Sequence, residues 1–298
     1  LSSGRHFGLL CWHHIATDGW SQGVFITEFA TLYQAFREGK NARGAALPEL
    51  PFQYGDYALW QQERLSDTDF QDKRTYWRHA LEGAPQSLSL FADRSRPARQ
   101  SFKGATLRFQ LSAKQTERAR KLGEASSITL YMLGLAVFLV LLNRWSRQHD
   151  ILVGTPVANR PNADTEKLIG YFVNTVVTRG KIDLAQPFGE LLTDMRDIVL
   201  NAFANQEVPF EQLVEDLSPD RHLDHSPLFQ VMFNLQNHET TNLVVPGLRL
   251  EEFEFDTGTA KFDINLTLIE KPDAGLDGHW EYATDLFDPA TAVCMADQ

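Results

Sequence analysis

Two adjacent histidines, His13 and His14, are the residues of this chain best suited to acid–base chemistry, and they open the run His-His-Ile-Ala-Thr-Asp-Gly that ends at Asp18 and Gly19. An imidazole can be neutral near pH 7 and then accept a proton from an attacking nucleophile. Asp18 is close enough in sequence to shape the same loop or to pair with a cation, and Gly19 suits a turn. The spacing therefore predicts a loop that holds a proton acceptor.

The flanking residues indicate what positions this loop. Residues 6–12 are short and apolar, which predicts a buried strand and makes Cys11 a buried free thiol. Residues 20–36 carry apolar side chains at helical spacing. The histidines are thus predicted to lie on a strand-to-helix turn. A pair of histidines can also serve only in packing or lie in solvent. The other segments of the chain must therefore decide between a chemical and a structural role for these two residues.

Composition restricts the classes of function. The 298 residues suffice for one large domain or two lobes, and the net charge of −11 argues against a nucleic-acid partner. With only Cys11 and Cys294, the sequence shows no disulfide framework and no metal-ligand spacing, which suits the cytoplasm. The most apolar run, residues 130–142, is shorter than the roughly 20 residues that span a bilayer, so we expect a buried helix and no membrane partner.

Periodicity and turn signals predict a mixed α+β or α/β fold. Ser112 is expected to cap a helix over residues 113–125, and Ser127 or Thr129 the buried helix that ends near Arg147. Other helices are predicted over residues 51–65, 69–81, 187–205 and 209–217. Strands are predicted over residues 106–111, 150–153, 171–179, 228–235, 248–255, 262–269 and 278–284.

Six motifs together resemble those of the condensation domain of nonribosomal peptide synthetases, and the resemblance covers nearly the whole chain. In chain order they are His13–Ser21, Tyr54–Gln61, Val153–Arg160 followed by Ile169–Thr175, Asn205–Val214, Arg221 with Ser226–Phe233, and Glu281–Phe287. The first motif also occurs in other acyltransferases, whereas the combination is specific.

The resemblance implies a chloramphenicol acetyltransferase-like sandwich of two lobes, with the histidine motif at their junction. Residues 1–48 would form the end of the N-terminal lobe and residues 49–298 the C-terminal lobe. Only twelve residues precede His13 and the chain does not start with Met. We therefore expect a fragment of a longer polypeptide that lacks most of the N-terminal lobe, and its activity in isolation stays open.

The implied activity is that of an amide-bond-forming acyltransferase. A donor acyl or peptidyl thioester and an acceptor aminoacyl thioester, both on carrier proteins, would be joined. The resemblance places His14 at the reaction, as general base or as a group that positions the amine, and assigns His13 and Gly19 to the motif loop. It implies that Asp18 holds this loop through an arginine salt bridge, for which Arg160 is a candidate within this chain, the alternative being an arginine of the missing part of the N-terminal lobe.

Further site residues and partners follow from the same resemblance. Candidates for the substrate tunnel are Trp20, Ser21, Asn174, Ser226 and Gln230, although Asn174 and Gln230 could equally satisfy backbone groups at strand ends. No metal and no directly bound cofactor are expected, because phosphopantetheine arrives as the arm of the carriers. The partners would be upstream and downstream peptidyl carrier domains and an adjacent adenylation domain, in antibiotic or other secondary metabolite biosynthesis.

One question of subtype and two alternative functions remain at this point. The wording of the first and third motifs is closer to the subtype that accepts a D-configured donor. An epimerisation domain shares the fold and the histidine motif. A non-catalytic docking module for carrier or tailoring proteins is the rival from a different class.

Overall fold

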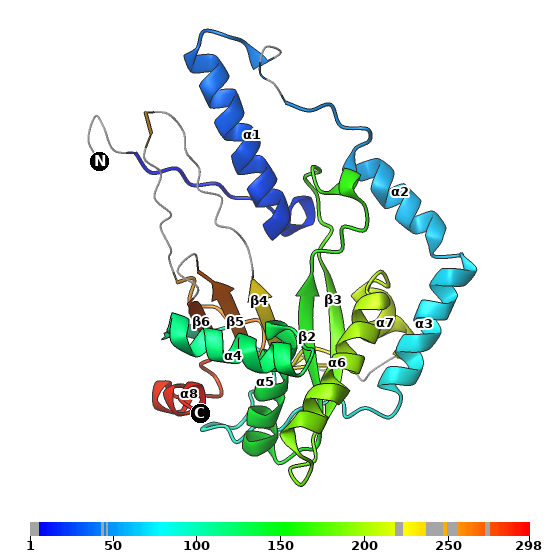
Figure 1. Ribbon diagram of the computed structural model, residues 1–298, viewed down its shortest axis with the longest axis vertical. Coiled ribbons are helices and arrows are strands. Elements are labelled where there is room, and N and C mark those ends of the chain that lie inside the picture. The colour runs from blue at the N-terminus through cyan, green and yellow to red at the C-terminus, as the bar shows by residue number, and fades with distance from the viewer. Residues whose placement is uncertain are drawn as a thin grey trace. The chain divides into compact units, whose positions relative to one another are not determined.

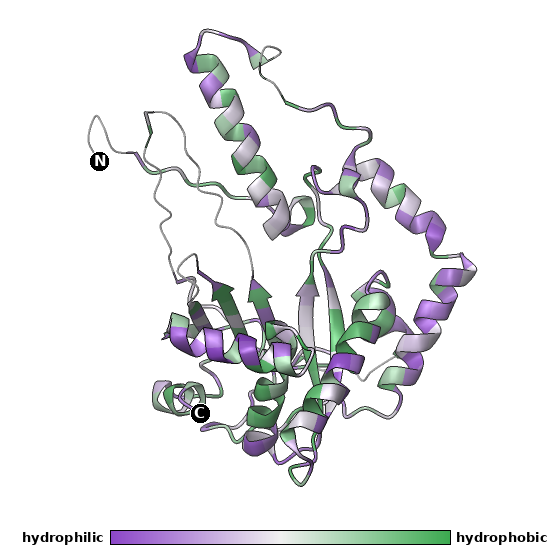
Figure 2. Cartoon of the chain, viewed as in Figure 1, coloured by the Kyte–Doolittle hydropathy of each residue, from purple (hydrophilic) through white to green (hydrophobic). Residues whose placement is uncertain are grey.

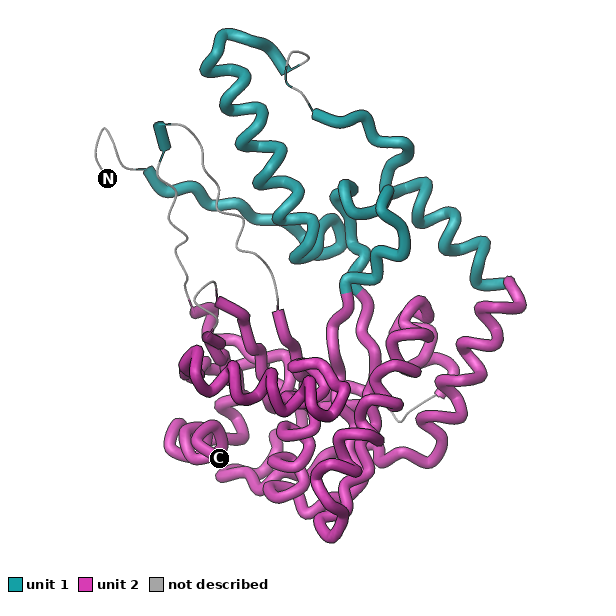
Figure 3. The backbone as a smooth tube through the Cα atoms, viewed as in Figure 1, with its two compact units in different colours: residues 1–66, 158–173, 241–252 teal, residues 67–157, 174–240, 253–298 magenta. Residues whose placement is uncertain are grey.

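The computed structural model describes residues 6–42, 45, 47–217, 223–236, 247–248, 256–271 and 275–298, and these residues belong to two compact units (Figure 3). Unit 1 consists of residues 1–66, 158–173 and 241–252, and unit 2 of the remainder. The histidine motif and the loop of residues 158–173 therefore belong to the same unit. The lobe boundary between residues 48 and 49 stays a prediction.

The described part of unit 1 contains two α-helices and the short 3₁₀ turns His14–Ala16 and Ala163–Thr165 (Figure 1). A short 3₁₀ turn, His14–Ala16, precedes α1 (Gly19–Arg37). The helix begins where it does because the Asp18 carboxylate accepts the Ser21 N–H at 2.8 Å and satisfies one of the free donors of the first turn. Helix α2 (Tyr54–Arg64) starts with a capping box between Gln53 and Asp56.

Unit 2 is built on a mixed sheet whose described strands, six in number, have the order β1-β6-β5-β4-β2-β3. The strands are β1 (Gly104–Leu111), β2 (Asp150–Val157), β3 (Asn174–Lys181), β4 (Val231–Gln236), β5 (Ile264–Glu270) and β6 (Leu276–Ala283). Pairing is parallel between β2 and β4 and between β4 and β5, and antiparallel elsewhere. Val157 pairs with Asn174, so residues 158–173 leave and re-enter the sheet at the same end of neighbouring strands.

Helices accompany the sheet in the described part of unit 2: α3 (Thr68–Leu81), α4 (Ala113–Ala125), α5 (Leu130–Ser146), α6 (Phe188–Ala204), α7 (Phe210–Leu217) and α8 (Pro289–Ala296). Helix α5 is apolar along most of its length, as its green colour in Figure 2 shows, and it packs on β2 and β4. Phe138 of α5 stacks on Phe233 of β4 with ring centroids 5.8 Å apart. The main core therefore lies between the sheet and α5, with α6 and α8 beside it.

Helix ends follow the predicted capping chemistry. Ser112 accepts the Gln115 N–H at the start of α4, and Thr129, rather than Ser127, accepts the Met132 N–H at the start of α5. Arg147 ends α5 in the left-handed conformation with φ of 59°. Within the described ranges, no single helix is long and apolar enough to cross a membrane, and only α4 and α5 together, bent by 100°, meet the criterion of length and composition.

The mixed α/β fold is confirmed, but one predicted element was wrong. Residues 6–12 form no strand, and the side chains of Phe7, Leu9 and Cys11 are exposed. A strand requires neighbours for its backbone N–H and C=O groups, and none of the described strands pairs with this segment. Strand β2 also runs four residues longer than predicted, to Val157. Nearly all of the predicted strand 248–255 lies outside the described residues.

Candidate active site

His14 is oriented by a hydrogen bond to its own loop. Its Nδ1 lies 2.8 Å from the carbonyl oxygen of Thr17. A carbonyl oxygen only accepts, so in the neutral ring Nδ1 carries the proton and Nε2 carries the free lone pair. The neighbouring His13 has a local role, because its Nδ1 accepts the Ile15 N–H at 3.1 Å. The loop thus presents one imidazole nitrogen, Nε2 of His14, as a proton acceptor.

Asp18 is the structural centre of this loop. Besides capping α1, its carboxylate accepts the backbone N–H groups of Phe172 at 3.0 Å and Val173 at 3.2 Å. Arg160, the candidate partner within this chain, lies beside it, with Nη2 at 3.2 Å from Oδ1. The capping role and the two backbone contacts were not predicted, although an Asp directly before a helical pattern is a recognisable cap signal.

Both partners of this ion pair are almost completely buried. The side chains of Arg160 and Asp18 are 2% and 3% exposed. Burial alone would raise the pKa of Asp18, but the hydrogen bond from the Ser21 backbone N–H, the charge of Arg160 and the Phe172 N–H together hold that pKa below its ordinary value. Asp18 is therefore ionised at neutral pH, and it acts on the loop as a fixed anion.

Arg160 extends the network along residues 158–173. Its Nη1 donates to the carbonyl oxygens of Thr165 and Leu168, and its guanidinium lies 4.1 Å from the centroid of the Phe172 ring. A planar guanidinium is suited to this combination of fork-shaped hydrogen bonds and stacking. The arginine thus fixes the loop that meets the motif and also neutralises Asp18.

The other candidates in unit 1 differ in exposure. Gly19 opens α1 with no neighbour close to where a Cβ would lie. Trp20 is partly exposed and donates its Nε1–H to the Glu166 carbonyl oxygen at 2.8 Å. Ser21 is completely buried. The prediction that Trp20 and Ser21 line a tunnel stays a prediction, and the burial of Ser21 favours a structural role.

Three further candidates, Asn174, Gln230 and Ser226, lie in unit 2, where two of them are engaged with backbone. The Asn174 amide donates to the carbonyl oxygens of Gln206 and Val208 and accepts the Phe210 N–H. Gln230 is buried and accepts the Leu88 N–H at 2.6 Å. Its amide nitrogen donates to the carbonyl oxygen of Ser226 at 3.0 Å. These contacts favour the simpler interpretation, in which both amides satisfy backbone groups, and the tunnel assignment is untested.

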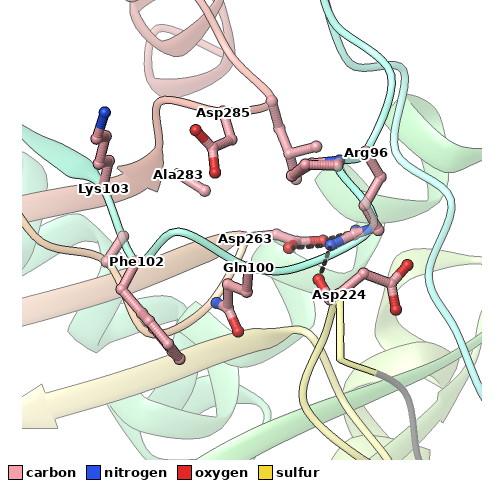
Figure 4. A pocket seen from close by; sticks show the side chains of 11 residues that line it. Arg96, Gln100, Phe102, Lys103, Asp224, Asp263, Ala283 and Asp285 are labelled. Carbon is pink, nitrogen blue, oxygen red and sulfur yellow. Dashed lines mark hydrogen bonds and ion pairs between the residues drawn. The ribbon is translucent and has the colours of Figure 1, made fainter.

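Unit 2 also holds a small cavity lined by the segments that precede β1 and β5, by Asp224, and by the end of β6 with the residues that follow it (Figure 4). Its volume of about 10 Å³ is roughly what one water molecule needs. Its most buried charge, Asp263, is bound by the Arg96 guanidinium, which also donates to the Asp224 carbonyl oxygen. Because these groups satisfy one another, the cavity is part of the framework of unit 2. In the described ranges no cluster of His, Cys, Asp and Glu could hold a metal ion.

Tyr171 is the residue near His14 that sequence reasoning missed. Its ring meets the imidazole edge to face, with centroids 5.2 Å apart and planes at 86°. It lies in the motif Ile169–Thr175, so its segment was recognised. Its contact depends on how two segments more than 150 residues apart meet, which no local pattern encodes.

Comparisons with known sequences identify the family. Residues 1–298 match the family described as Condensation domain. Among the relatives, a linear gramicidin synthase polypeptide of Brevibacillus parabrevis is 45% identical over 298 residues, which are 99% of this chain and 4% of that protein. Malpinin synthetase of Mortierella alpina is 42% identical over 283 residues, which are 95% of this chain and 4% of that protein. The chain therefore spans a small part of the curated relatives that it matches.

Solved structures show the same fold. The X-domain from teicoplanin biosynthesis superposes with a TM-score of 0.86 at 29% identity, covering 96% of this chain and 65% of that one, and it has also been solved in complex with OxyB. The four-domain nonribosomal peptide synthetase holo-AB3403 gives a TM-score of 0.85 at 27% identity, covering 95% of this chain and 22% of that one. On the family match and these likenesses, the chain belongs to the condensation domain family of nonribosomal peptide synthetases.

Proposed function

We propose that this domain forms an amide bond between two carrier-bound substrates, and that His14 receives the proton released in the reaction. The observation that carries the proposal is the bond from His14 Nδ1 to the Thr17 carbonyl oxygen at 2.8 Å, which leaves Nε2 as the basic nitrogen. Family membership supports the reaction class. Base catalysis of this kind contributes about 10²–10⁴-fold in rate.

The proposed step balances without a resident cofactor. The amine nitrogen of the acceptor attacks the carbonyl carbon of the donor thioester, the C–N bond forms, and the C–S bond breaks. The proton lost by the amine passes to His14 Nε2 and then to the departing sulfur. If His14 instead positions the amine or binds the tetrahedral oxygen, the same bonds form and break, but the imidazole stays neutral.

The partners in the proposal are carrier proteins. Donor and acceptor arrive as thioesters of phosphopantetheine on upstream and downstream peptidyl carrier domains, and an adenylation domain loads the acceptor. The gramicidin synthase relative is a long polypeptide, of which the matched region is 4%. We include a D-configured donor in the proposal, on the wording of the first and third motifs, and a cytoplasmic location, on the cysteine usage.

The test is product formation by a polypeptide that carries this chain together with its two loaded carrier domains. His14→Ala is expected to lower turnover by about 10²-fold or more. His79→Ala, which changes an exposed histidine of α3, is the matched control and is expected to keep the parent rate. Absence of product from the parent with every donor and acceptor pair, L- or D-configured, would contradict the proposal. Inversion of the donor Cα without amide formation would indicate an epimerisation domain.

A docking module is the second candidate, because the X-domain with a TM-score of 0.86 was also solved in complex with another protein, OxyB. This function needs the surface of the fold and does not need a basic Nε2. Measured binding of carrier or tailoring proteins, unchanged by His14→Ala and without any condensation by the parent, would favour it.

A further inference from the structure

The Ser21 hydroxyl is bound on all sides by the loop of residues 158–173. It donates to the Gly170 carbonyl oxygen at 2.9 Å and accepts the Gly170 N–H at 3.1 Å and Arg160 Nη2 at 2.8 Å. A hydroxyl has one donor and two acceptor lone pairs, so its capacity is used fully. Ser21 is also 0% exposed. It is therefore placed neither to attack a substrate nor to bind one.

Its partner, Gly170, directly precedes the tyrosine that touches His14. Beyond Tyr171, the N–H groups of Phe172 and Val173 are held by Asp18. The carbonyl oxygen of Tyr171 itself accepts the Tyr54 hydroxyl at 2.7 Å. The backbone on both sides of Tyr171 is thus bound by side chains, and two of these, Asp18 and Ser21, come from the start of α1.

Gly170 needs such a restraint more than another residue would. A glycine has the widest backbone freedom. Any side chain here would force the neighbouring ring to move, because a Cβ on Gly170 would lie 2.1 Å from the Tyr54 ring. Because glycine has no side chain that restricts its own backbone, contacts from other residues must hold the backbone at this position. Ser21 does this by binding both the N–H and the C=O of the residue.

We propose that Ser21 is a positioning residue for His14: by fixing Gly170 it sets the place of the Tyr171 ring, which meets the His14 imidazole edge to face at 5.2 Å. The imidazole is then oriented from two sides, by the Thr17 carbonyl oxygen at Nδ1 and by Tyr171. One short segment, from His14 to Ser21, carries the imidazole and also fixes the ring against which it packs. The consequence for rate rests on the proposed function, whereas the effect on the imidazole does not.

The first test observes the His14 ring directly. In the chain labelled with ¹⁵N-histidine, Ser21→Ala is expected to change the Nδ1 and Nε2 resonances of His14 and its balance of tautomers, with His14→Ala used for assignment. Ser146→Ala is the matched control, since it removes a buried hydroxyl that accepts the Gln148 N–H in unit 2. The control is expected to leave the His14 resonances unchanged. Identical His14 resonances in folded Ser21→Ala and parent chains would overturn the proposal.

A second pair of variants keeps the test decisive if Ser21→Ala does not fold. Tyr171→Leu, at a partly exposed position, removes the ring and is expected to shift the same His14 resonances, while Tyr171→Phe keeps the ring and is expected to restore them. Unchanged resonances in Tyr171→Leu would refute the role of Tyr171.

The consequence for rate separates the two hypotheses. In the carrier-bound assay, Ser21→Ala is expected to lower kcat roughly 10- to 100-fold with little change in the KM for the acceptor carrier. A parent without condensation activity, combined with shifted His14 resonances in Ser21→Ala, would refute the proposed function and leave the positioning role intact. An active parent whose Ser21→Ala variant shows the parental kcat and the parental His14 resonances would refute the positioning role and leave the proposed function intact.

Discussion

Neutralising Asp18 should release residues 170–173 from the start of α1. The Asp18→Asn variant keeps the size of the side chain and one carbonyl oxygen, but it removes the charge that balances Arg160. It also places an amide NH₂ where the carboxylate now accepts the N–H groups of Phe172 and Val173. The perturbation therefore affects one ion pair and two defined backbone donors.

The magnitude follows from burial. Both side chains of the pair are 3% exposed or less, and removal of one partner from a buried pair costs about 3–5 kcal/mol, because the remaining charge stays desolvated. Arg160 keeps the carbonyl oxygens of Thr165 and Leu168 as partners, so we expect the lower end, about 3 kcal/mol. By comparison, Lys121→Met in the exposed pair with Glu117 should cost less than about 1 kcal/mol.

Native-state hydrogen exchange at the Phe172 and Val173 amides measures this loss of stability at the site itself, because both N–H groups donate to Asp18. A loss of about 3 kcal/mol corresponds to exchange about 10²-fold faster, and Lys121→Met should leave both amides as they are. In the double variant that combines Asp18→Asn with Arg160→Met, the loss of local stability should be smaller than the sum of the losses in the two single variants. The reason is that no buried charge of the pair remains. Parental exchange in Asp18→Asn, or strictly additive losses, would refute the reasoning.

The same amides report the pH dependence. Because the pKa of Asp18 is lower in the folded chain than its ordinary 3.8, its ionised form contributes stability above pH 3.8. That contribution should disappear as the pH falls below 3.8 and through the folded-state value. After correction for intrinsic exchange, protection at Phe172 and Val173 should therefore fall in the parent over this range and stay flat in Asp18→Asn.

Two more substitutions test the packing of each unit. Gly170→Ala should destabilise unit 1 by about 1–3 kcal/mol, because its Cβ would meet the Tyr54 ring at 2.1 Å. Its control is Gly55→Ala in α2, whose Cβ meets nothing within 4 Å and which should stabilise the chain by up to about 1 kcal/mol. Urea denaturation of both variants measures these changes, and equal effects of the two substitutions would contradict the prediction. Gln230→Ala should cost about 1–3 kcal/mol, since the buried Leu88 N–H loses its acceptor, and hydrogen exchange at Leu88 should rise with it; parental protection of that amide would argue against the interpretation.

Local chemistry made most of the framework predictable. Some features depend only on neighbours in sequence: the apolar run that forms α5, the caps at Ser112 and Thr129, and the alternation in β1. These elements appear where they were expected. The segment of residues 6–12 failed for a physical reason: apolar composition indicates burial, but a strand exists only where another strand accepts its hydrogen bonds.

The sequence predicted which residues form the site better than it predicted how these residues contact one another. The motif singled out His14 and Asp18, and Arg160 was a candidate for the salt bridge that the resemblance implied. The contact of Tyr171 with His14 and the full occupation of the Ser21 hydroxyl could not be read from periodicity, because each joins segments about 150 residues apart. The amide of Gln230 shows the converse, since its motif suggested a tunnel and its side chain is occupied by backbone groups.

The distance along the chain between Asp18 and Arg160 also has a consequence for synthesis. The partner of Asp18 lies 142 residues downstream. At about 5–20 residues per second, a ribosome needs roughly 7–28 s to make that stretch. During this time the nascent polypeptide holds the aspartate without its cation, and α1 has no loop to pack against. Ribosome-bound chains that stop before Arg160 should therefore be sensitive to protease at α1 and dependent on chaperones, and extension past Val173 should end both.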